Sequence, residues 1–108
     1  MNAIEELELT ILSNMINRMP VYMSLCRYSS DLFDTADLGI WFDAIRDCYS
    51  GGGYCDMITI MKQMQGDGKI DVFHRWMDRV AAAPSVPVDM ETHIETLKQQ
   101  YGKLMMLS

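Results

Sequence analysis

Apolar residues recur at helical spacing along most of this chain. In the middle of the sequence they form one stripe: Ile40, Trp41, Ala44, Ile45, Cys48 and Tyr49. This spacing stacks side chains on one side of an α-helix, so it predicts a helix over residues 40–49 that is buried along that side. Three consecutive glycines, residues 51–53, are expected to end it, because glycine adopts left-handed conformations without strain.

Two further segments carry long apolar stripes. Residues 4–16 place six apolar side chains on one side: Ile4, Leu7, Ile11, Leu12, Met15 and Ile16. Acidic residues stand near the start of this segment, where the helix dipole favours negative charge: Glu5, Glu6 and Glu8. Residues 70–83 carry a second stripe, Phe73, Trp76, Met77 and Val80, before Pro84 and Pro87. We predict a helix over each segment, the second ended by its prolines.

Shorter elements connect these helices. Asp56 is placed to cap a helix that begins at Met57 and stops before Gly66, with Ile58, Met61 and Met64 along its buried face. Pro20 suits the first position of another helix, over residues 20–28, in which Val21, Leu25 and Tyr28 repeat at helical spacing. Leu32 and Phe33 are expected to fill the core from the turn that follows.

The last segment, residues 90–107, follows Asp89 as a candidate cap and has apolar residues in alternating steps of four and three. Such spacing is typical of a helix that packs against another helix, either in its own domain or in a partner. Three further apolar residues at its end would leave an exposed hydrophobic surface on an isolated monomer. We therefore predict a protein interface here, formed by Ile94, Leu97, Tyr101, Leu104, Met105, Met106 and Leu107.

No run alternates apolar and polar residues for long enough to predict a strand, and no segment repeats at a fixed period. The length of 108 residues suits one domain. The sequence therefore predicts an all-α fold, a compact orthogonal bundle of about five to six short helices in a single domain over residues 1–108.

Charge and hydropathy narrow the classes of partner. The net charge is −6 and the nine basic residues are scattered, whereas proteins that bind phosphate backbones gather Lys and Arg into a patch. We expect no direct nucleic-acid binding, and we expect the acidic surface to serve solubility or a basic protein partner. No apolar run is long enough to span a bilayer and no signal peptide is recognisable, so a cytoplasmic location without membrane contact is expected.

The chain carries no recognisable catalytic motif. Gly66, Gly68 and Lys69 lack the spacing of a phosphate-binding loop, and no nucleophile elbow or H-E-x-x-H helix occurs. His74 is expected at the edge of the core, and nearly all of the 15 carboxylates in solvent. The sequence predicts a chain that is not an enzyme, with no catalytic residue and no cofactor.

The cysteines also have two interpretations. Three occur, Cys26, Cys48 and Cys55, with no C-x-x-C pair. Zinc would need these thiols together with His74 or His93, but the close paired spacing of structural zinc sites is missing. Free thiols in and near the core are the preferred interpretation, without a metal.

A set of short motifs occurs in one order along the chain. They are Glu6-Leu7-Glu8 leading into Ile11-Leu12, Asp31-Leu32-Phe33, Phe42-Asp43-Ala44-Ile45-Arg46, Asp56-Met57-Ile58-Thr59 and Gly68-Lys69-Ile70. In this order and register, and continuing through Trp76-Met77 and Val80, the chain resembles the N-terminal domain of bacterial replicative DNA helicases of the DnaB type. The resemblance covers nearly the whole chain. Leu38-Gly39, Leu12-Ser13 and the lack of Gly-Gly after Ile70 depart from the family pattern and place the chain at its edge, as in a phage or prophage member.

The resemblance implies a function in DNA replication. It implies a non-catalytic helical domain that self-associates in the collar of a hexameric helicase and docks primase or a helicase loader. It also implies that the chain belongs to a longer ATP-dependent helicase, with the helix over residues 90–107 leading toward the linker. The alternative is a freestanding small adaptor or inhibitor of the same fold that binds primase or the host helicase. A small enzyme with an unmarked site is a third hypothesis.

Overall fold

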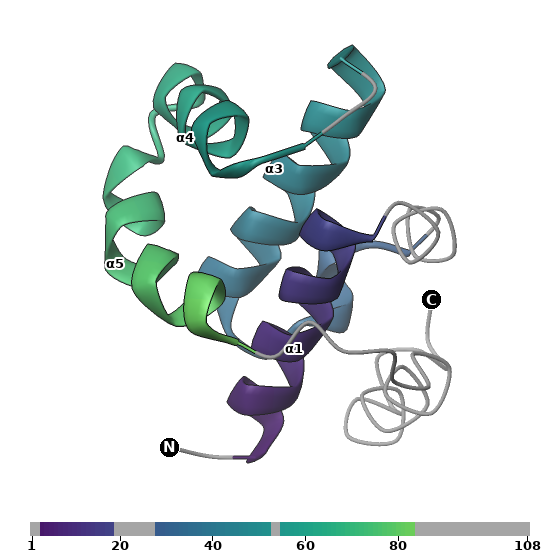
Figure 1. Ribbon diagram of the computed structural model, residues 1–108. Coiled ribbons are helices and arrows are strands. Elements are labelled where there is room, and N and C mark those ends of the chain that lie inside the picture. The colour runs from purple at the N-terminus through teal and green to yellow at the C-terminus, as the bar shows by residue number, and fades with distance from the viewer. Residues whose placement is uncertain (1–2, 19–27, 53–54, 84–108) are drawn as a thin grey trace.

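The computed structural model describes residues 3–18, 28–52 and 55–83, and within them the chain forms four α-helices and one 3-10 turn. In chain order they are α1 (Ala3–Asn17), the turn η1 (Ser30–Leu32), α3 (Ala36–Gly52), α4 (Met57–Gly66) and α5 (Ile70–Ala82) (Figure 1). No strand occurs in these ranges. The predicted all-α class is therefore confirmed for the described part of the chain.

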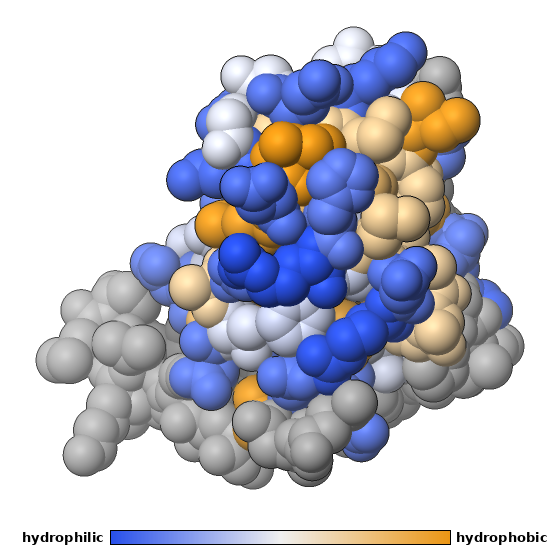
Figure 2. Space-filling model, turned by 90° about the vertical axis from the view of Figure 1, so that its left-hand side faces the viewer, coloured by the Kyte–Doolittle hydropathy of each residue, from blue (hydrophilic) through white to orange (hydrophobic). Residues whose placement is uncertain are grey.

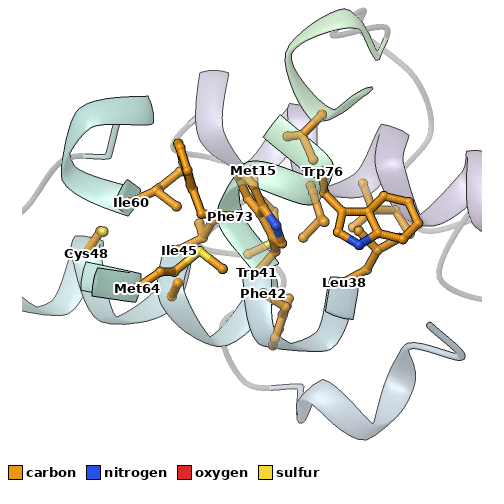
Figure 3. Packing of buried hydrophobic residues seen from close by; sticks show 14 of the residues in the cluster. Met15, Leu38, Trp41, Phe42, Ile45, Cys48, Ile60, Met64, Phe73 and Trp76 are labelled. Carbon is orange, nitrogen blue, oxygen red and sulfur yellow. The ribbon is translucent and has the colours of Figure 1, made fainter. Parts of the chain in front are cut away.

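Helix α3 lies at the centre of the arrangement. The other elements, α1, η1, α4 and α5, all pack against it, and α5 also contacts α1 and α4. The buried side chains form one continuous row along α3, with Cys48 and Met64 at one end, Trp41 and Phe73 in the middle and Leu38 at the other end (Figure 3). This row is the hydrophobic core.

The predicted stripe on α3 is confirmed, and α3 buries more than that stripe. Trp41, Ala44, Ile45, Cys48 and Tyr49 are buried, as predicted, and Ile40 is partly buried. Leu38 and Phe42 are also fully buried, outside the predicted stripe. The reason is that helices pack on more than one side of α3, so a wider part of its circumference is apolar.

Trp41 is the centre of the aromatic packing. Its ring stacks on Phe73 of α5, with centroids 5.2 Å apart and planes at 16°, and its indole N–H donates to the carbonyl of Val72 at 3.3 Å. A buried tryptophan needs such a partner for its only polar atom. These contacts fix α5 against the middle of α3.

The predicted bounds of α3 were too narrow at both ends. The helix begins at Ala36, and the Thr35 carbonyl already accepts the backbone N–H groups of Leu38 and Gly39. At the other end it continues through Gly51 and Gly52, neither of which has a positive φ. The helix ends within the glycine run, as predicted, but the prediction of left-handed conformations is wrong for Gly51 and Gly52. Gly53 lies outside the described residues.

Helix α4 begins as predicted but buries a different face. Asp56 caps it by accepting the Thr59 backbone N–H at 2.8 Å, while the Thr59 hydroxyl accepts the Asp56 N–H at 2.9 Å, which completes a capping box. Ile60 and Met64 are buried, whereas Ile58 is 60% exposed. The prediction that Ile58 lines the core is wrong, because the buried positions follow Ile60 at i and i+4.

The C-terminal end of α4 is closed by Gly68. The helix continues one residue further than predicted, through Gly66, and Gly68 then adopts a φ of 73°. The N–H of Lys69 donates to the Met64 carbonyl at 2.7 Å, and the N–H of Gly68 donates to the Gln65 carbonyl at 3.2 Å. This pair of bonds is a Schellman motif, which requires the left-handed conformation that glycine tolerates best.

The other predicted elements have mixed outcomes. The helices predicted over residues 4–16 and 70–83 are confirmed as α1 and α5, and Phe33 is buried beside η1 as predicted. Except for Tyr28, the helices predicted over residues 20–28 and 90–107 lie outside the described residues. The count of five to six helices and their orthogonal packing therefore stay predictions. None of the helices described is long and apolar enough to cross a membrane.

Gly68 provides a test of how α4 ends. Changing Gly68 to Ala should lower the free energy of unfolding by about 1–2 kcal/mol, the usual cost of a left-handed conformation for a residue with a Cβ atom. The space around Gly68 is open, so no clash adds to this cost. Urea denaturation of both variants measures the effect.

Gly66→Ala is the matched control, because Gly66 lies within the helix and also has open space around it. It should leave stability unchanged or raise it by up to about 1 kcal/mol. Equal effects of the two substitutions would contradict the Schellman closure.

Candidate functional site

The interface predicted from the sequence lies entirely outside the described residues. This holds for each of its members: Ile94, Leu97, Tyr101, Leu104, Met105, Met106 and Leu107. The structure neither brings them together nor separates them, so the interface stays a prediction. Within the described residues, polar side chains gather at three places where helices meet, and these are the candidate functional features.

The first is a polar cluster around Trp76. One carboxylate oxygen of Asp37, at the start of α3, accepts the Trp76 indole N–H at 2.8 Å and an Arg75 N–H at 2.7 Å. The hydrogen bond from Trp76 is the main reason that the pKa of Asp37 lies below its ordinary value, and the bond from Arg75 and its charge add to this effect. Asp37 is therefore ionised at neutral pH and holds α5 against α3.

Arg79 extends this cluster to α1. Its guanidinium lies over the Trp76 ring, 4.6 Å from the centroid, and pairs with the Glu5 carboxylate. Two arginines and two carboxylates thus surround one nearly buried indole, and their charges balance. The arrangement joins three helices through a cation–π contact and two ion pairs.

The second feature is a buried carboxylate that the sequence prediction missed. Glu8 of α1 is fully buried, although its side chain was expected in solvent. Its two oxygens accept the backbone N–H of Asp34 at 2.5 Å, the N–H of Thr35 at 3.4 Å and the Thr35 hydroxyl at 2.9 Å. The carboxylate therefore holds the segment that leads from η1 into α3.

A signal for this burial exists in the sequence. Glu8 follows Ile4 by four residues and precedes Ile11 and Leu12 by three and four, so it lies inside the apolar stripe of α1. A carboxylate in such a position needs hydrogen-bond donors from elsewhere in the fold. The donors are backbone groups some 26 residues away, which spacing alone does not reveal.

Burial governs the protonation of Glu8. The pKa of its carboxyl is raised above the ordinary value, because removal from water disfavours the charged form by more than the three hydrogen bonds favour it. The native state therefore binds a proton at a pH where the unfolded chain has already lost it. Folding stability due to Glu8 is greatest below the ordinary pKa and declines as pH rises through the raised value.

The third feature is a pair of thiols between α3 and α4. Cys48 is buried on α3, as predicted, and Cys55 is partly buried just before the Asp56 cap. Cys48 and Thr59 line one hollow between the two helices, and Cys55 directly precedes the Asp56 cap of α4. Desolvation raises the pKa of both thiols above the ordinary range, so both are protonated at neutral pH.

Two surface hollows adjoin these thiols. The α3–α4 hollow has a volume of about 360 Å³ and is lined by Asp47, Cys48, Gly51, Gly52, Thr59, Lys62 and Gln63. The α1–α4–α5 hollow has a volume of about 250 Å³ and is lined by Ser13, Ile16, Asn17, Cys55, Asp56, Met57, Val80 and Ala81. The first volume lies slightly above the lower end for small-molecule sites, about 300 Å³, and the second lies below it, so the hollows suit at most a small molecule or a single side chain.

Other residues singled out by the sequence have plain environments. His74 is exposed on α5, and its ring lies edge-on to the core residue Phe73 with centroids 5.5 Å apart, which is consistent with the predicted place at the edge of the core. Among residues 3–18, 28–52 and 55–83, no three potential ligand side chains are grouped so that they could hold a metal ion.

The side formed by α4 and α5 is mostly hydrophilic, with small separate apolar areas (Figure 2).

Comparison of this chain with protein-family models, with curated proteins and with solved structures gives no match. Its function is therefore argued from its own residues.

The raised pKa of Glu8 predicts a pH dependence of stability. As pH falls from 7 toward the ordinary carboxyl value of about 4.5, wild type should gain stability relative to Glu8→Gln, because only the Glu8 carboxyl takes up a proton in the native state. Each pH unit over which the native state alone holds this proton adds at most about 1.4 kcal/mol. Denaturant unfolding of both proteins at a series of pH values measures the difference.

Glu6→Gln is the control, since Glu6 is exposed on the same helix. Its stability relative to wild type should change little over this range. If the stabilities of wild type and Glu8→Gln stayed parallel from pH 7 down to about 4.5, burial would not govern the Glu8 carboxyl.

Proposed function

We propose that this chain is a non-catalytic, protein-binding domain of a replicative DNA helicase of the DnaB type. In this proposal it associates with copies of itself in the helicase collar and offers a docking surface to primase or to a helicase loader. The single observation that carries the proposal is the ordered set of motifs between Glu6 and Val80. Further support comes from the positions of these motifs in the fold, which are helix ends and core positions.

The motif residues occupy positions on which a shared bundle would depend. Asp31-Leu32-Phe33 includes the end of η1 and a buried phenylalanine. Asp56 and Thr59 form the capping box of α4, and Gly68 supplies the left-handed residue of the Schellman motif. A resemblance at helix ends and core positions supports a common architecture, because these positions set where helices begin, end and pack.

Charge supports a protein as the partner. The net charge of −6 disfavours contact with a phosphate backbone and suits a basic partner surface. Three of the described arginines, Arg46, Arg75 and Arg79, are each paired with a carboxylate of the chain itself. Their positive charge is therefore largely balanced within the fold, which is consistent with an acidic docking domain.

The helix predicted over residues 90–107 provides the test. We expect the purified chain to self-associate, and we expect Leu97→Glu with Leu104→Glu to give a folded but less associated protein, because charges on an apolar interface must be desolvated. Sedimentation measures oligomer size, and circular dichroism checks the fold. Light scattering with a purified primase C-terminal domain measures the docking function.

Thr92→Glu with Gln99→Glu is the matched control, because it adds the same charge off the apolar stripe of the same segment. It should leave association unchanged. An unchanged oligomer size in the Leu97 and Leu104 variant would contradict the predicted interface. If neither the primase domain nor a helicase loader bound the chain, the proposed docking function would be wrong.

A further inference from the structure

The turn that joins α4 to α5 contains an aspartate followed directly by a glycine (Figure 1). These are Asp67 and Gly68, and no other aspartate of the sequence is followed by glycine. Both residues are exposed, and the space around Gly68 is open. Because glycine has no Cβ atom, its amide nitrogen can approach the carboxyl group of the preceding aspartate with little steric hindrance. The pair therefore combines two groups that can react with each other.

The reaction open to such a pair is isomerisation through a succinimide ring. The Gly68 amide nitrogen attacks the carboxyl carbon of the Asp67 side chain, a C–N bond forms, and the carboxyl OH leaves with the amide hydrogen as water. Water then opens the ring at one of its two carbonyl groups. Opening at the side-chain carbonyl restores aspartate, whereas opening at the main-chain carbonyl gives isoaspartate. One water is released and one is consumed, so no co-reactant is required.

The closed turn holds the reacting atoms apart. Asp67 has a φ of −87° and a ψ of 0°. At this ψ the Gly68 nitrogen eclipses the Asp67 nitrogen and is turned away from the Asp67 side chain. The Gln63 side chain also donates to the Asp67 carboxylate at 3.2 Å, from the preceding turn of α4. Attack on the carboxyl carbon therefore requires rotation about the Cα–C bond of Asp67.

That rotation opens the Schellman motif. The N–H of Gly68 donates to the Gln65 carbonyl at 3.2 Å and the N–H of Lys69 donates to the Met64 carbonyl at 2.7 Å, and both bonds depend on the orientation of the peptide after Asp67. Loss of two backbone hydrogen bonds makes the open turn about 5- to 150-fold less populated than the closed turn. The reaction therefore proceeds from a locally opened state of the native protein.

We propose that Asp67 is a site of spontaneous isoaspartate formation and that the Schellman motif at the end of α4 sets the rate of this modification. Gly68 supplies both features, since it closes the helix in a left-handed conformation and provides an unhindered nitrogen. Isoaspartate adds the Cβ atom of Asp67 to the backbone, so the turn cannot form the same two bonds again. The modification thus loosens the connection between α4 and α5 in aged molecules. This inference is independent of the proposed function.

The test is prolonged incubation at neutral pH of the folded protein and of the same protein in concentrated guanidinium chloride. After removal of the denaturant, trypsin releases a peptide of residues 63–69 that contains Asp67. Isoaspartate leaves the mass of this peptide unchanged, alters its elution and makes it resistant to a protease that cleaves before aspartate. We expect isoaspartate in both samples, formed about 5- to 150-fold more slowly in the folded protein.

Three variants separate the chemistry from the fold. Asp67→Glu should give no isomer, because the larger ring closes far more slowly. In guanidinium chloride, where the fold has no influence, Gly68→Ala should slow isomerisation, because its Cβ atom hinders the attacking nitrogen. Gly66→Ala is the matched control and should leave that rate unchanged, since it keeps the Asp-Gly pair.

Three results would overturn the proposal. The first is equal rates of isoaspartate formation in the folded and the denatured protein, which would show that the Schellman motif has no influence. The second is a denatured chain that forms no isoaspartate at Asp67. The third is a folded protein without isoaspartate at Asp67 at the time when the denatured chain has reached equilibrium.

Discussion

The central constraint on this fold is that α3 must pack against every other described element at once. Its buried residues extend from Leu38 to Tyr49 and face α1, α4, α5 and η1. Burial of one large apolar side chain contributes about 1.5–3 kcal/mol, whereas an exposed ion pair such as Arg75–Asp37 contributes about 0–1 kcal/mol. The apolar row along α3 therefore supplies most of the stability, and the polar contacts determine how the helices are placed around it.

Those polar contacts lie where helices begin, end or cross. The Glu8 carboxylate holds the backbone that leads into α3, and the Tyr49 hydroxyl lies 2.8 Å from the Met15 carbonyl near the end of α1. The Ser13 hydroxyl donates to the Ala83 carbonyl at 3.1 Å, just after α5. Backbone groups at helix ends lack partners within the helix, so side chains from neighbouring helices satisfy them and fix the relative positions of the helices. The thiols of Cys48 and Cys55 occupy a similar junction, between α3 and α4.

Local sequence patterns predicted the positions of the helices well, but they predicted the contacts between helices less well. The stripes of α1, α3 and α5 and the Asp56 cap could be found because each depends on residues within a few positions of one another. The hydrogen-bond donors of Glu8 and the Trp76–Asp37 bond could not, since both depend on residues that are distant in sequence, although the position of Glu8 within the α1 stripe did indicate its burial. Ile58 was misplaced because short helices offer too few turns to fix which face is buried.

Native-state hydrogen exchange tests the central position of α3 most directly. If every other helix packs on α3, the amides from Trp41 to Cys48 can exchange only when the whole bundle unfolds. Their exchange free energies should equal the free energy of global unfolding from denaturant experiments, and they should be at least as high as those of α5. Lower values for these amides than for α5 would show that α3 opens while the remaining helices stay folded, and would contradict this account.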